Sequence, residues 1–414
     1  MNADPKPEGR APEAPRMMSA MRQAPAVAPH LRRYLALRDF EEHAMRFLPR
    51  MLAGFVGGGV ETDWSLRDNR EVFGDYAFVP KMLNDVSHRT TKRTLFGREY
   101  SAPFGIPPMG ASALIAYRGD LVLAQEAAKA NVPMIMSASS LIRLEEVQKA
   151  GQGNAWYQAY LPGEPARIEP LVDRVAAAGF DTFVLTVDVQ VSANRENNIR
   201  TGYSIPLKIG PKIAWDIGTH PGWLFKTWLK TLRRHGMPHF ENMDAMRGPP
   251  VVSKDLVRAF GARDQLSWEH LALIRRRWKG NLVVKGILSP EDAAKCREYG
   301  VDGIMVSNHG GRQLDGAVAP LRVLPEIAAV AGDMTVMFDS GIRRGTDVLK
   351  ALALGAQFVF VGRPMLCAAA VAGEEGVALA IKLLTEEVGR DMALLGIESL
   401  DQLGPQYLRR VRGG

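Results

Sequence analysis

The segment SNHGGRQLDG, residues 307–316, places a histidine and an arginine three residues apart among glycines. A neutral imidazole can accept a proton near pH 7, so His309 is suited to act as a general base. The guanidinium of Arg312 can hold a carboxylate through two parallel hydrogen bonds. Asp188, which ends the run TFVLTVD, could stabilise the resulting imidazolium, or could instead cap a helix or form a salt bridge. These side chains predict a site that removes a proton from a bound anion.

Two glycine–arginine segments late in the chain, DSGIRRG and VGRP, predict a second anion site. Gly341 and Gly362 would let backbone N–H groups approach a phosphate, and Arg343 and Arg363 would add charge-assisted hydrogen bonds. Either segment alone is equally typical of a turn beside a surface arginine. The two together favour phosphate binding.

Lys285, at the end of LVVKG, would be costly to bury without a negative partner. A flavin is one such partner, because its N1–C2 edge becomes anionic on reduction. A Schiff-base lysine, as in aldolases, is the alternative. The lysine alone does not decide between the two.

Eight short apolar runs recur along the chain, and amphipathic stretches such as DLVLAQEAAKA and GTDVLKALALGA separate them. Nearly continuous apolar runs of this length are typical of parallel strands buried on both faces. The alternation predicts an α/β protein with the (β/α)8 TIM-barrel fold, and no GxGxxG follows the first run as a Rossmann fold would require. The runs cover residues 104–110, 133–139, 155–160, 182–188, 282–286, 303–308, 335–341 and 358–363.

In such a barrel the reactive side chains project from the C-terminal ends of the strands. Nearly every run here ends on a polar group, and most of the charged ones are cationic, so we expect these ends to converge on one pocket. In order they are Gly110, Ser137, Gln158 with Tyr160, Thr186 with Asp188, Lys285, His309 with Arg312, Asp339 with Arg343, and Arg363.

Three further regions complete the predicted organisation. Residues 1–30, dominated by proline and alanine, are expected to form a disordered tail, and a helix is expected from Leu31 onward. Residues 31–414 are expected to form one barrel domain. About ninety residues separate the fourth and fifth runs, which predicts a long insertion, about 196–265, on the catalytic face.

The formal charge of +7 is compatible with an anionic ligand or an anionic membrane surface. No zinc-finger spacing or RNA-binding motif is present, so we expect no nucleic-acid partner and no bound metal. The two cysteines, Cys296 and Cys367, form no CxxC pattern, which favours a reducing, cytoplasmic location. No run of about 18 apolar residues was found, so no membrane-spanning helix is expected.

SNHGGRQLDG, LTVDV, VVKGILSPEDA, DSGIRRGTDVLKALALGA and VGRP resemble motifs of the FMN-dependent 2-hydroxy acid dehydrogenase and oxidase family. This family includes glycolate oxidase, L-lactate dehydrogenase and (S)-mandelate dehydrogenase, and the resemblance runs from about Leu48 to the C-terminus. It implies an FMN cofactor and oxidation of an L-2-hydroxy acid, lactate-like or mandelate-like or larger, to the 2-oxo acid. His309 would be the base and the flavin N5 the electron acceptor.

The resemblance also implies a role for each matching residue. His309 and Asp188 match the catalytic base and its partner, and Lys285 matches the lysine at the flavin N1–O2 edge. Tyr160, Arg195 and Arg312 match substrate contacts, and Phe55 stands at a further substrate-binding position. The implied FMN contacts are Pro108, Met109, Gly110, Ser137, Gln158, Thr186, Lys285, Ser307, Asp339, Gly341, Arg343, Gly362 and Arg363.

Four positions depart from the family pattern. Phe55 replaces a usual tyrosine, which removes one hydrogen bond of about 1–3 kcal/mol to the substrate carboxylate and questions a simple small substrate. Met109 stands where relatives often have threonine. Ser139 replaces the tryptophan of glycolate oxidase, which predicts a roomier pocket. Gly110 replaces the alanine of glycolate oxidases, as in mandelate dehydrogenase, and favours a dehydrogenase.

Within the insertion, residues 209–240 alternate aromatic and basic side chains. This composition is typical of a membrane interface, as in the similar stretch of membrane-associated mandelate and lactate dehydrogenases, and equally of a helix that covers the barrel. The membrane interpretation implies peripheral contact with the inner face of the cell membrane and a quinone acceptor. The aromatic residues that form this pattern are Trp215, Trp223, Phe225 and Trp228, and the basic ones that alternate with them are Lys226, Lys230, Arg233 and Arg234.

Alternative functions remain open at this point. One is an oxidase or monooxygenase of the same family that uses O2. Another is a catalytically silent barrel that binds a phosphate ligand, and a Schiff-base aldolase is a weaker one. By analogy with relatives, a homotetramer is expected.

Overall fold

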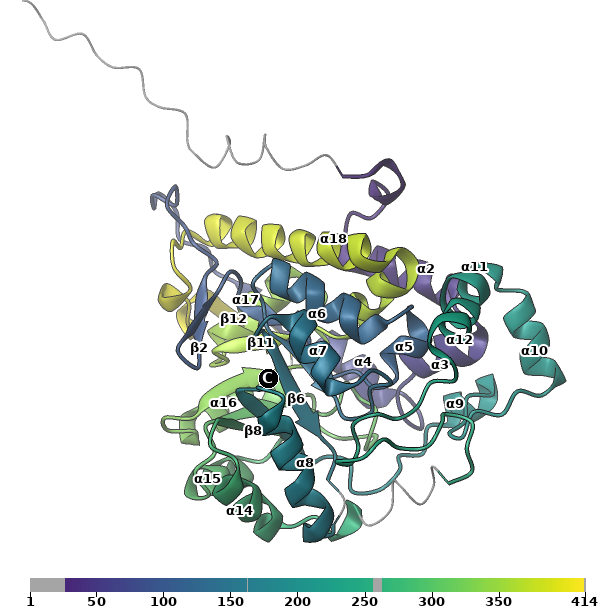
Figure 1. The fold of residues 1–414 in the computed structure, drawn as a ribbon. Helices are drawn as coiled ribbons and strands as arrows, with labels where there is room; N and C mark the ends of the chain where they lie inside the picture. The colour runs from purple at the N-terminus through teal and green to yellow at the C-terminus, as the bar shows by residue number, and fades with distance from the viewer. Residues whose placement is uncertain (1–26, 162, 256–262, 413–414) are drawn as a thin grey trace, which may run out of the picture.

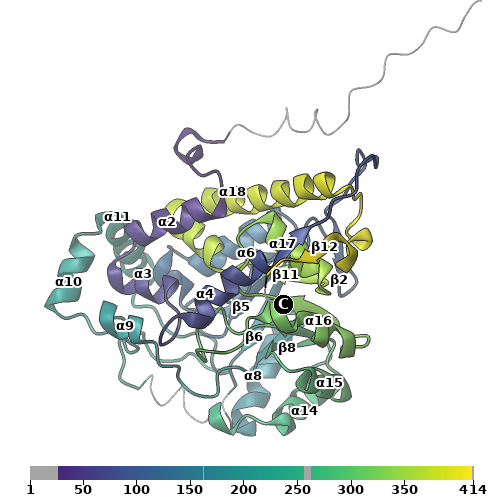
Figure 2. The same ribbon diagram turned by 180° about the vertical axis from the view of Figure 1, so that it is seen from behind.

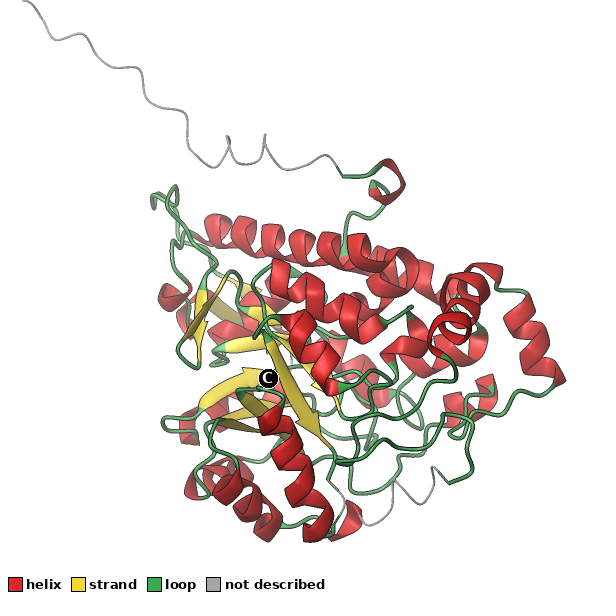
Figure 3. Ribbon diagram, viewed as in Figure 1, coloured by secondary structure: helices red, strands yellow, loops and turns green. Residues whose placement is uncertain are grey.

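The computed structural model describes residues 27–161, 163–255 and 263–412. Within them an eight-stranded parallel sheet has the order β4-β11-β10-β9-β8-β7-β6-β5. A parallel bridge between Ile106 and Met134 joins the two ends of this order, and the Ile135 N–H donates to the Ile106 carbonyl at 2.8 Å. The sheet therefore closes into a barrel with helices around it, and the predicted (β/α)8 fold is confirmed (Figures 1 and 3).

Each predicted apolar run overlaps one barrel strand. Every residue of β5, β6, β7 and β9 is buried, as expected for strands covered on both faces. The strands are β4 (Phe104–Gly105), β5 (Met134–Ser137), β6 (Ala155–Ala159), β7 (Thr182–Thr186), β8 (Asn281–Ile287), β9 (Gly303–Val306), β10 (Thr335–Phe338) and β11 (Phe358–Phe360).

The amphipathic stretches form helices outside the barrel. In the helix that begins at Pro290, the Ser289 hydroxyl accepts a hydrogen bond from the Asp292 N–H at 3.1 Å and satisfies one otherwise unpaired donor. The outer helices are α5 (Ser112–Ile115), α6 (Gly119–Lys129), α7 (Leu144–Gly151), α8 (Pro165–Ala177), α14 (Trp268–Arg277), α15 (Pro290–Glu298), α16 (Pro320–Val330), α17 (Gly345–Ala353) and α18 (Arg363–Leu395).

Large side chains fill the barrel interior, so it is a packed core and not a channel. Trp156, Met305 and Phe360 belong to this cluster. The hairpin of β2 (Arg93–Leu95) and β3 (Arg98–Tyr100) ends just before β4 begins and adds its own apolar residues to the cluster. This hairpin closes the N-terminal end of the barrel, so the polar strand ends lie at the opposite end.

The described parts of the N-terminal and C-terminal segments pack around the barrel (Figure 2). The helix expected from Leu31 begins later, at Leu37, because the Asp39 carboxylate accepts the N–H groups of Leu35 and Ala36 and fixes the helix start there. Of the expected tail, residues 1–26 lie outside the described residues. The remaining elements here are η1 (Pro29–Leu31), α2 (Leu37–Phe47), α3 (Arg50–Gly57), α4 (Trp64–Glu71), η2 (Val72–Asp75), the antiparallel pair β1 (Tyr76–Phe78) and β12 (Leu408–Arg410), η5 (Leu400–Gln402) and η6 (Pro405–Tyr407).

The helix α18 corrects one expectation. Among the described helices it is long and apolar enough to cross a membrane, although the sequence analysis found no such run. However, 67% of its apolar window is buried inside the molecule, and Gly373 interrupts its helical geometry with a φ of 57°. Its apolar residues belong to the protein core, which accounts for its composition.

The insertion follows β7 and forms short helices that extend to one side of the barrel (Figure 1). Trp223 is buried, and its indole N–H donates to the Leu114 carbonyl at 2.8 Å. The ring of Trp228, which is also buried, stacks on the Trp223 ring with centroids 6.1 Å apart. The helices are α9 (Glu196–Thr201), α10 (Pro211–Gly218), α11 (Pro221–Trp223), η3 (Leu224–Leu229), α12 (Lys230–His235) and η4 (Arg263–Gln265).

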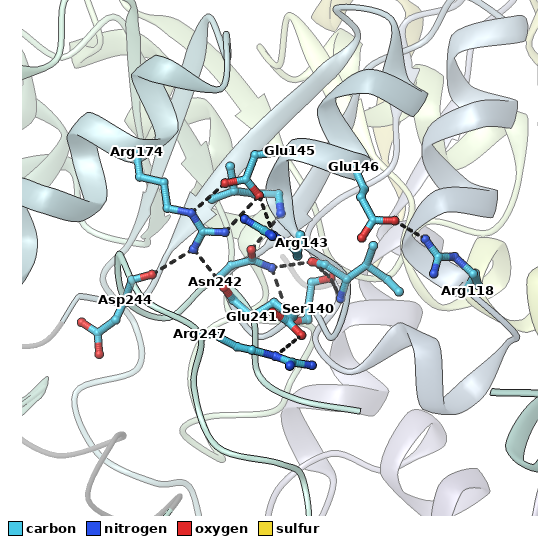
Figure 4. Close-up of polar contacts among 12 residues, drawn as sticks. Arg118, Ser140, Arg143, Glu145, Glu146, Arg174, Glu241, Asn242, Asp244 and Arg247 are labelled. Carbon is cyan, nitrogen blue, oxygen red and sulfur yellow. Dashed lines mark hydrogen bonds and ion pairs between the residues drawn. The ribbon is translucent and has the colours of Figure 1, made fainter. Parts of the chain in front are cut away.

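Beyond α12, the fully buried Asn242 fastens the insertion to the barrel (Figure 4). Its side-chain oxygen accepts the Leu144 N–H at 2.8 Å at the start of α7, and its NH2 group donates to the Ile142 carbonyl at 2.7 Å. The backbone carbonyl of Asn242 accepts a hydrogen bond from the Tyr157 hydroxyl at 2.5 Å. Nearby, Arg174 donates to the Glu241 carbonyl at 2.9 Å. The buried side-chain amide of Asn242 therefore pairs with a backbone N–H at the start of α7 and with a backbone carbonyl of the preceding loop.

We expect Asn242→Ala to lower the free energy of unfolding by about 2–4 kcal/mol, because it strands a buried N–H and a buried carbonyl. The midpoint of thermal unfolding of the FMN-loaded protein would fall accordingly. Asn84→Ala is the control, since it removes one exposed hydrogen bond, to the Gly396 carbonyl. Equal effects of the two changes would contradict the anchoring role of Asn242.

Candidate active site

His309 lies directly beyond β9 in a backbone conformation that non-glycine residues rarely adopt, with a φ of 58°. Gly310 and Gly311 follow with φ of 67° and 71°, and a Cβ on Gly311 would lie 2.5 Å from the Leu66 nitrogen. The His309 N–H donates to the Ser307 hydroxyl at 3.1 Å. The glycines of the motif thus produce the turn that presents the imidazole, and strain of this kind is common at functional sites.

The imidazole is oriented by a carboxylate, as predicted from sequence. His309 Nδ1 lies 2.9 Å from Asp188 Oδ1, beyond the end of β7. An ionised carboxylate only accepts, so Nδ1 carries the proton and Nε2 keeps its lone pair. Burial lowers the pKa of His309 below its ordinary value, against the opposing effect of Asp188. The neutral imidazole at neutral pH is therefore a competent base at Nε2, which lies 3.5 Å from the Tyr160 hydroxyl.

Lys285 has a protein partner for its charge. Its Nζ lies 3.1 Å from Asp339 Oδ2 and 2.6 Å from the Ser307 hydroxyl. Burial opposes the charge, but Asp339 and Asp188 more than offset it and raise the pKa of Lys285. From the sequence, a flavin was the partner expected for this charge. A lysine held as an ammonium is a poor nucleophile, which disfavours the Schiff-base alternative.

Arg195, Arg312 and Arg363 form a partly buried group of cations, hereafter the arginine cluster. Their guanidinium groups donate to backbone carbonyls and to the Gln313 amide, and among the described residues none forms a salt bridge. Burial and repulsion from Arg195 and Arg363 lower the pKa of Arg312 well below its ordinary value. Burial and repulsion, chiefly from Arg343, lower the pKa of Arg363 to about 10. An anion bound here would relieve this unfavourable arrangement.

Arg343, expected at the phosphate site, is already paired in this structure. Its Nε lies 2.5 Å from a carboxylate oxygen of Glu41 on α2. Arg70, which the sequence analysis did not identify, donates to the Gly341 carbonyl and lies 3.1 Å from Asp347. A phosphate bound near β10 and β11 would contact two arginines. Arg363 has no carboxylate partner among the described residues, whereas Arg343 is paired with Glu41.

Unpartnered buried atoms test whether the predicted residues fit FMN. Among the described residues, Gln158 Nε2 and Thr186 Oγ1 are buried without a hydrogen-bond partner, and the Ser137 hydroxyl donates to Gln158 Oε1 at 3.0 Å. Native proteins rarely leave such groups unpaired. The polar edge of an isoalloxazine ring would satisfy them, so these residues fit the cofactor.

Glycines keep the backbones close around the same region. A Cβ on Gly341, whose φ is 92°, would lie 2.0 Å from the Asn69 carbonyl oxygen. A Cβ on Gly362 would lie 3.1 Å from Pro107 and 3.5 Å from the Met109 sulfur. Pro108, Met109 and Gly110 follow β4 in the same loop, and a Cβ on Gly110 would lie 3.0 Å from that of Ser139. The strand ends predicted for cofactor binding are therefore neighbours.

Three further side chains at the site were missed from sequence. The ring of Tyr203 stacks on Phe55 with centroids 4.3 Å apart, and the Arg263 guanidinium lies 4.9 Å from the Tyr160 ring centroid. Gln313 donates to the Asp188 carbonyl at 3.1 Å. Gln313 lies inside the motif and could have been found there, whereas the other two lie in the insertion. No group of three or more His, Cys, Asp or Glu that could hold a metal ion occurs in the described part of the chain.

Comparison with known proteins agrees with this geometry. The family model described as FMN-dependent dehydrogenase matches residues 44–410. (S)-mandelate dehydrogenase of Pseudomonas putida is 35% identical over 90% of this chain and 93% of its own. L-lactate dehydrogenase of Pectobacterium atrosepticum is 36% identical over 91% of this chain and 97% of its own.

Solved structures give the same result. The crystal structure of the monotopic membrane protein (S)-mandelate dehydrogenase has a TM-score of 0.84 and 34% identity, over 92% of this chain and all of that chain. A mandelate oxidase structure with 2-hydroxy-phenylacetamide has a TM-score of 0.76 and 34% identity, over 92% of this chain and 99% of that one. Because the similarity extends over nearly the whole chain in sequence and in fold, the resemblance seen in the motifs is confirmed, and the chain belongs to the family of FMN-dependent dehydrogenases that act on 2-hydroxy acids.

Proposed function

We propose that the protein oxidises an L-2-hydroxy acid, lactate-like or mandelate-like or with a larger side chain, to the 2-oxo acid. The observation that carries this proposal is the placement of the neutral base His309 beside the arginine cluster, whose charges lack carboxylate partners among the described residues. A substrate that is an anion at one end and an alcohol at the other suits both parts.

In the proposed reaction, Arg312 and Arg195 hold the substrate carboxylate, and Tyr160 lies beside the reacting hydroxyl. His309 Nε2 accepts the hydroxyl proton, and Asp188 stabilises the imidazolium that results. When bound, FMN would supply at N5 the acceptor for the C2 hydrogen together with its two bonding electrons, a hydride equivalent. The product is the 2-oxo acid. The proton taken from the substrate hydroxyl remains on His309 until it is released to solvent.

The FMN would be held by the ring of strand ends. Ser137, Gln158 and Thr186 offer hydrogen bonds to the isoalloxazine ring, with Pro108, Met109 and Gly110 beside it. The positive charge of Lys285, fixed by Asp339 and Ser307, would face the N1–O2 edge and stabilise negative charge there. Asp339, Gly341, Arg343, Gly362 and Arg363 would hold the ribityl chain and phosphate.

For the electron acceptor we favour a quinone, reached through peripheral contact of residues 209–240 with the inner face of the cell membrane. A relative of known structure is a monotopic membrane protein. Of the five Phe and Trp residues in this segment, Trp223, Trp228 and Phe240 are buried. Only Trp215 and Phe225, 76% and 65% exposed, could enter a lipid surface. A cytoplasmic homotetramer is proposed by analogy alone.

A second candidate function is that of an oxidase, because one structural relative is a mandelate oxidase. The two functions share the reductive half-reaction and differ in what reoxidises the flavin. Gly110, which leaves more open space in its loop than an alanine would, weakly favours the dehydrogenase.

An anaerobic visible spectrum tests the shared chemistry. We expect flavin bands that bleach on addition of L-lactate, L-mandelate or a longer L-2-hydroxy acid, while the D-enantiomers leave them unchanged. Slow recovery of the bands in air would favour the dehydrogenase and recovery within the mixing time the oxidase. Bands that none of these acids bleaches would contradict the proposed reaction.

The pH dependence of flavin reduction tests His309. Only the neutral imidazole accepts a proton, so the rate at low substrate should fall as the pH drops through the pKa of His309, which lies below about 6.5. His309→Gln should slow reduction about 100- to 10,000-fold and abolish this pH dependence. The exposed His88→Gln serves as the control. An unchanged acid limb in the His309 variant would exclude it as the base.

Membrane contact is tested by sedimentation with vesicles that contain anionic lipid. Replacement of Trp215 and Phe225 by serine should reduce the bound fraction severalfold, because both exposed rings are lost. The matched control is replacement of Met82 and Leu394 by serine, because both side chains are 66% exposed and lie outside the insertion. The contact is refuted when the parent protein stays in the supernatant at low salt.

A further inference from the structure

Two aromatic rings from distant parts of the chain meet beside the arginine cluster. Phe55 lies on α3, and Tyr203 follows α9 in the insertion. The rings stack with centroids 4.3 Å apart and an interplanar angle of 23°. The Arg312 guanidinium carbon lies 5.2 Å from the Phe55 ring centroid. This pair therefore lies at the end of the site that we assign to the substrate carboxylate.

Backbone contacts fix the position of Tyr203. Gly202, with a φ of 87°, ends α9, and the Tyr203 N–H turns back to donate to the Asn198 carbonyl at 2.8 Å. On the same helix, Asn197 Nδ2 donates to the Gly54 carbonyl at 2.9 Å. Because Gly54 directly precedes Phe55, α9 and α3 hold the two rings in register.

The hydroxyl of Tyr203 is in an unusual position. The residue is only 6% exposed, and its hydroxyl makes no hydrogen bond among the described residues. Burial raises the pKa of Tyr203 to about 12, and the nearby charges of Arg312 and Arg195 oppose that rise. The hydroxyl is therefore a neutral donor close to two cations, and neither cation can accept its proton.

We propose that Tyr203 donates a hydrogen bond to the carboxylate of the substrate, an inference that rests on the proposed function. Tyr203 would thus supply, from the insertion, the hydroxyl that Phe55 lacks. An anion between Arg312 and Arg195 would offer an acceptor to the Tyr203 hydroxyl, which makes no hydrogen bond among the described residues. Tyr160 cannot take this role as readily, because its own hydroxyl lies 3.5 Å from His309 Nε2, at the reacting end.

Tyr203→Phe separates this role from simple ring packing, because phenylalanine keeps the stacked ring. The probe is the dissociation constant of the 2-oxo acid product, or of benzoate if mandelate is the substrate, measured from the perturbed flavin spectrum. We expect that constant to rise about tenfold, with the KM for the 2-hydroxy acid rising similarly. The FMN content and the midpoint of thermal unfolding should match the parent protein.

The exchanged variant, Phe55→Tyr with Tyr203→Phe, returns a hydroxyl to the same ring pair from the opposite side. It should recover most of the lost affinity, whereas a purely structural role predicts no recovery. Carboxylate affinity of Tyr203→Phe within twofold of the parent would overturn the inference and leave the proposed function intact. A parent protein that no L-2-hydroxy acid reduces would overturn the proposed function itself.

Discussion

The burial of like charges at one end of the barrel is the constraint on which the rest of the site depends. Arg195, Arg312 and Arg363 are partly buried, and among the described residues none has a carboxylate within salt-bridge distance. Desolvated charges of one sign are tolerated only when dipoles surround them and an anion completes the site. The protein supplies the dipoles as carbonyl groups, and the substrate and cofactor are anions.

Those carbonyls come largely from outside the barrel. Arg312 donates to the Gly58 carbonyl at 2.7 Å, and Arg363 to the Val56 carbonyl at 3.0 Å. Asn69 on α4 and Asn308 beside the base exchange two hydrogen bonds of 2.8 Å through their side-chain amides. The N-terminal helices are therefore part of the active site. A barrel that lacked them would leave Arg312 without its Gly58 acceptor and Arg363 with the Gly310 carbonyl.

This dependence explains which features were predictable. The strands were found because each is a local apolar run, and His309, Asp188 and Lys285 because each lies in a short motif at a strand end. The pairing of Arg343 with Glu41 joins residues about 300 positions apart, and no local pattern encodes it. Likewise Trp223 lies in a segment whose composition fitted a membrane interface and a barrel-covering helix equally. It is buried, and its partner, the Leu114 carbonyl, comes from α5.

The insertion shows how one segment can serve two surfaces. Its first part, from Glu196 to Tyr203, is fastened to α3 through Asn197 and lies beside the arginine cluster. Its later part is fastened separately, by Trp223 to the barrel helices, and leaves Trp215 exposed. Because the two anchors share no residue, a change on the outer face need not move the inner one. Substrate recognition and surface attachment can therefore vary independently within a single connection between two strands.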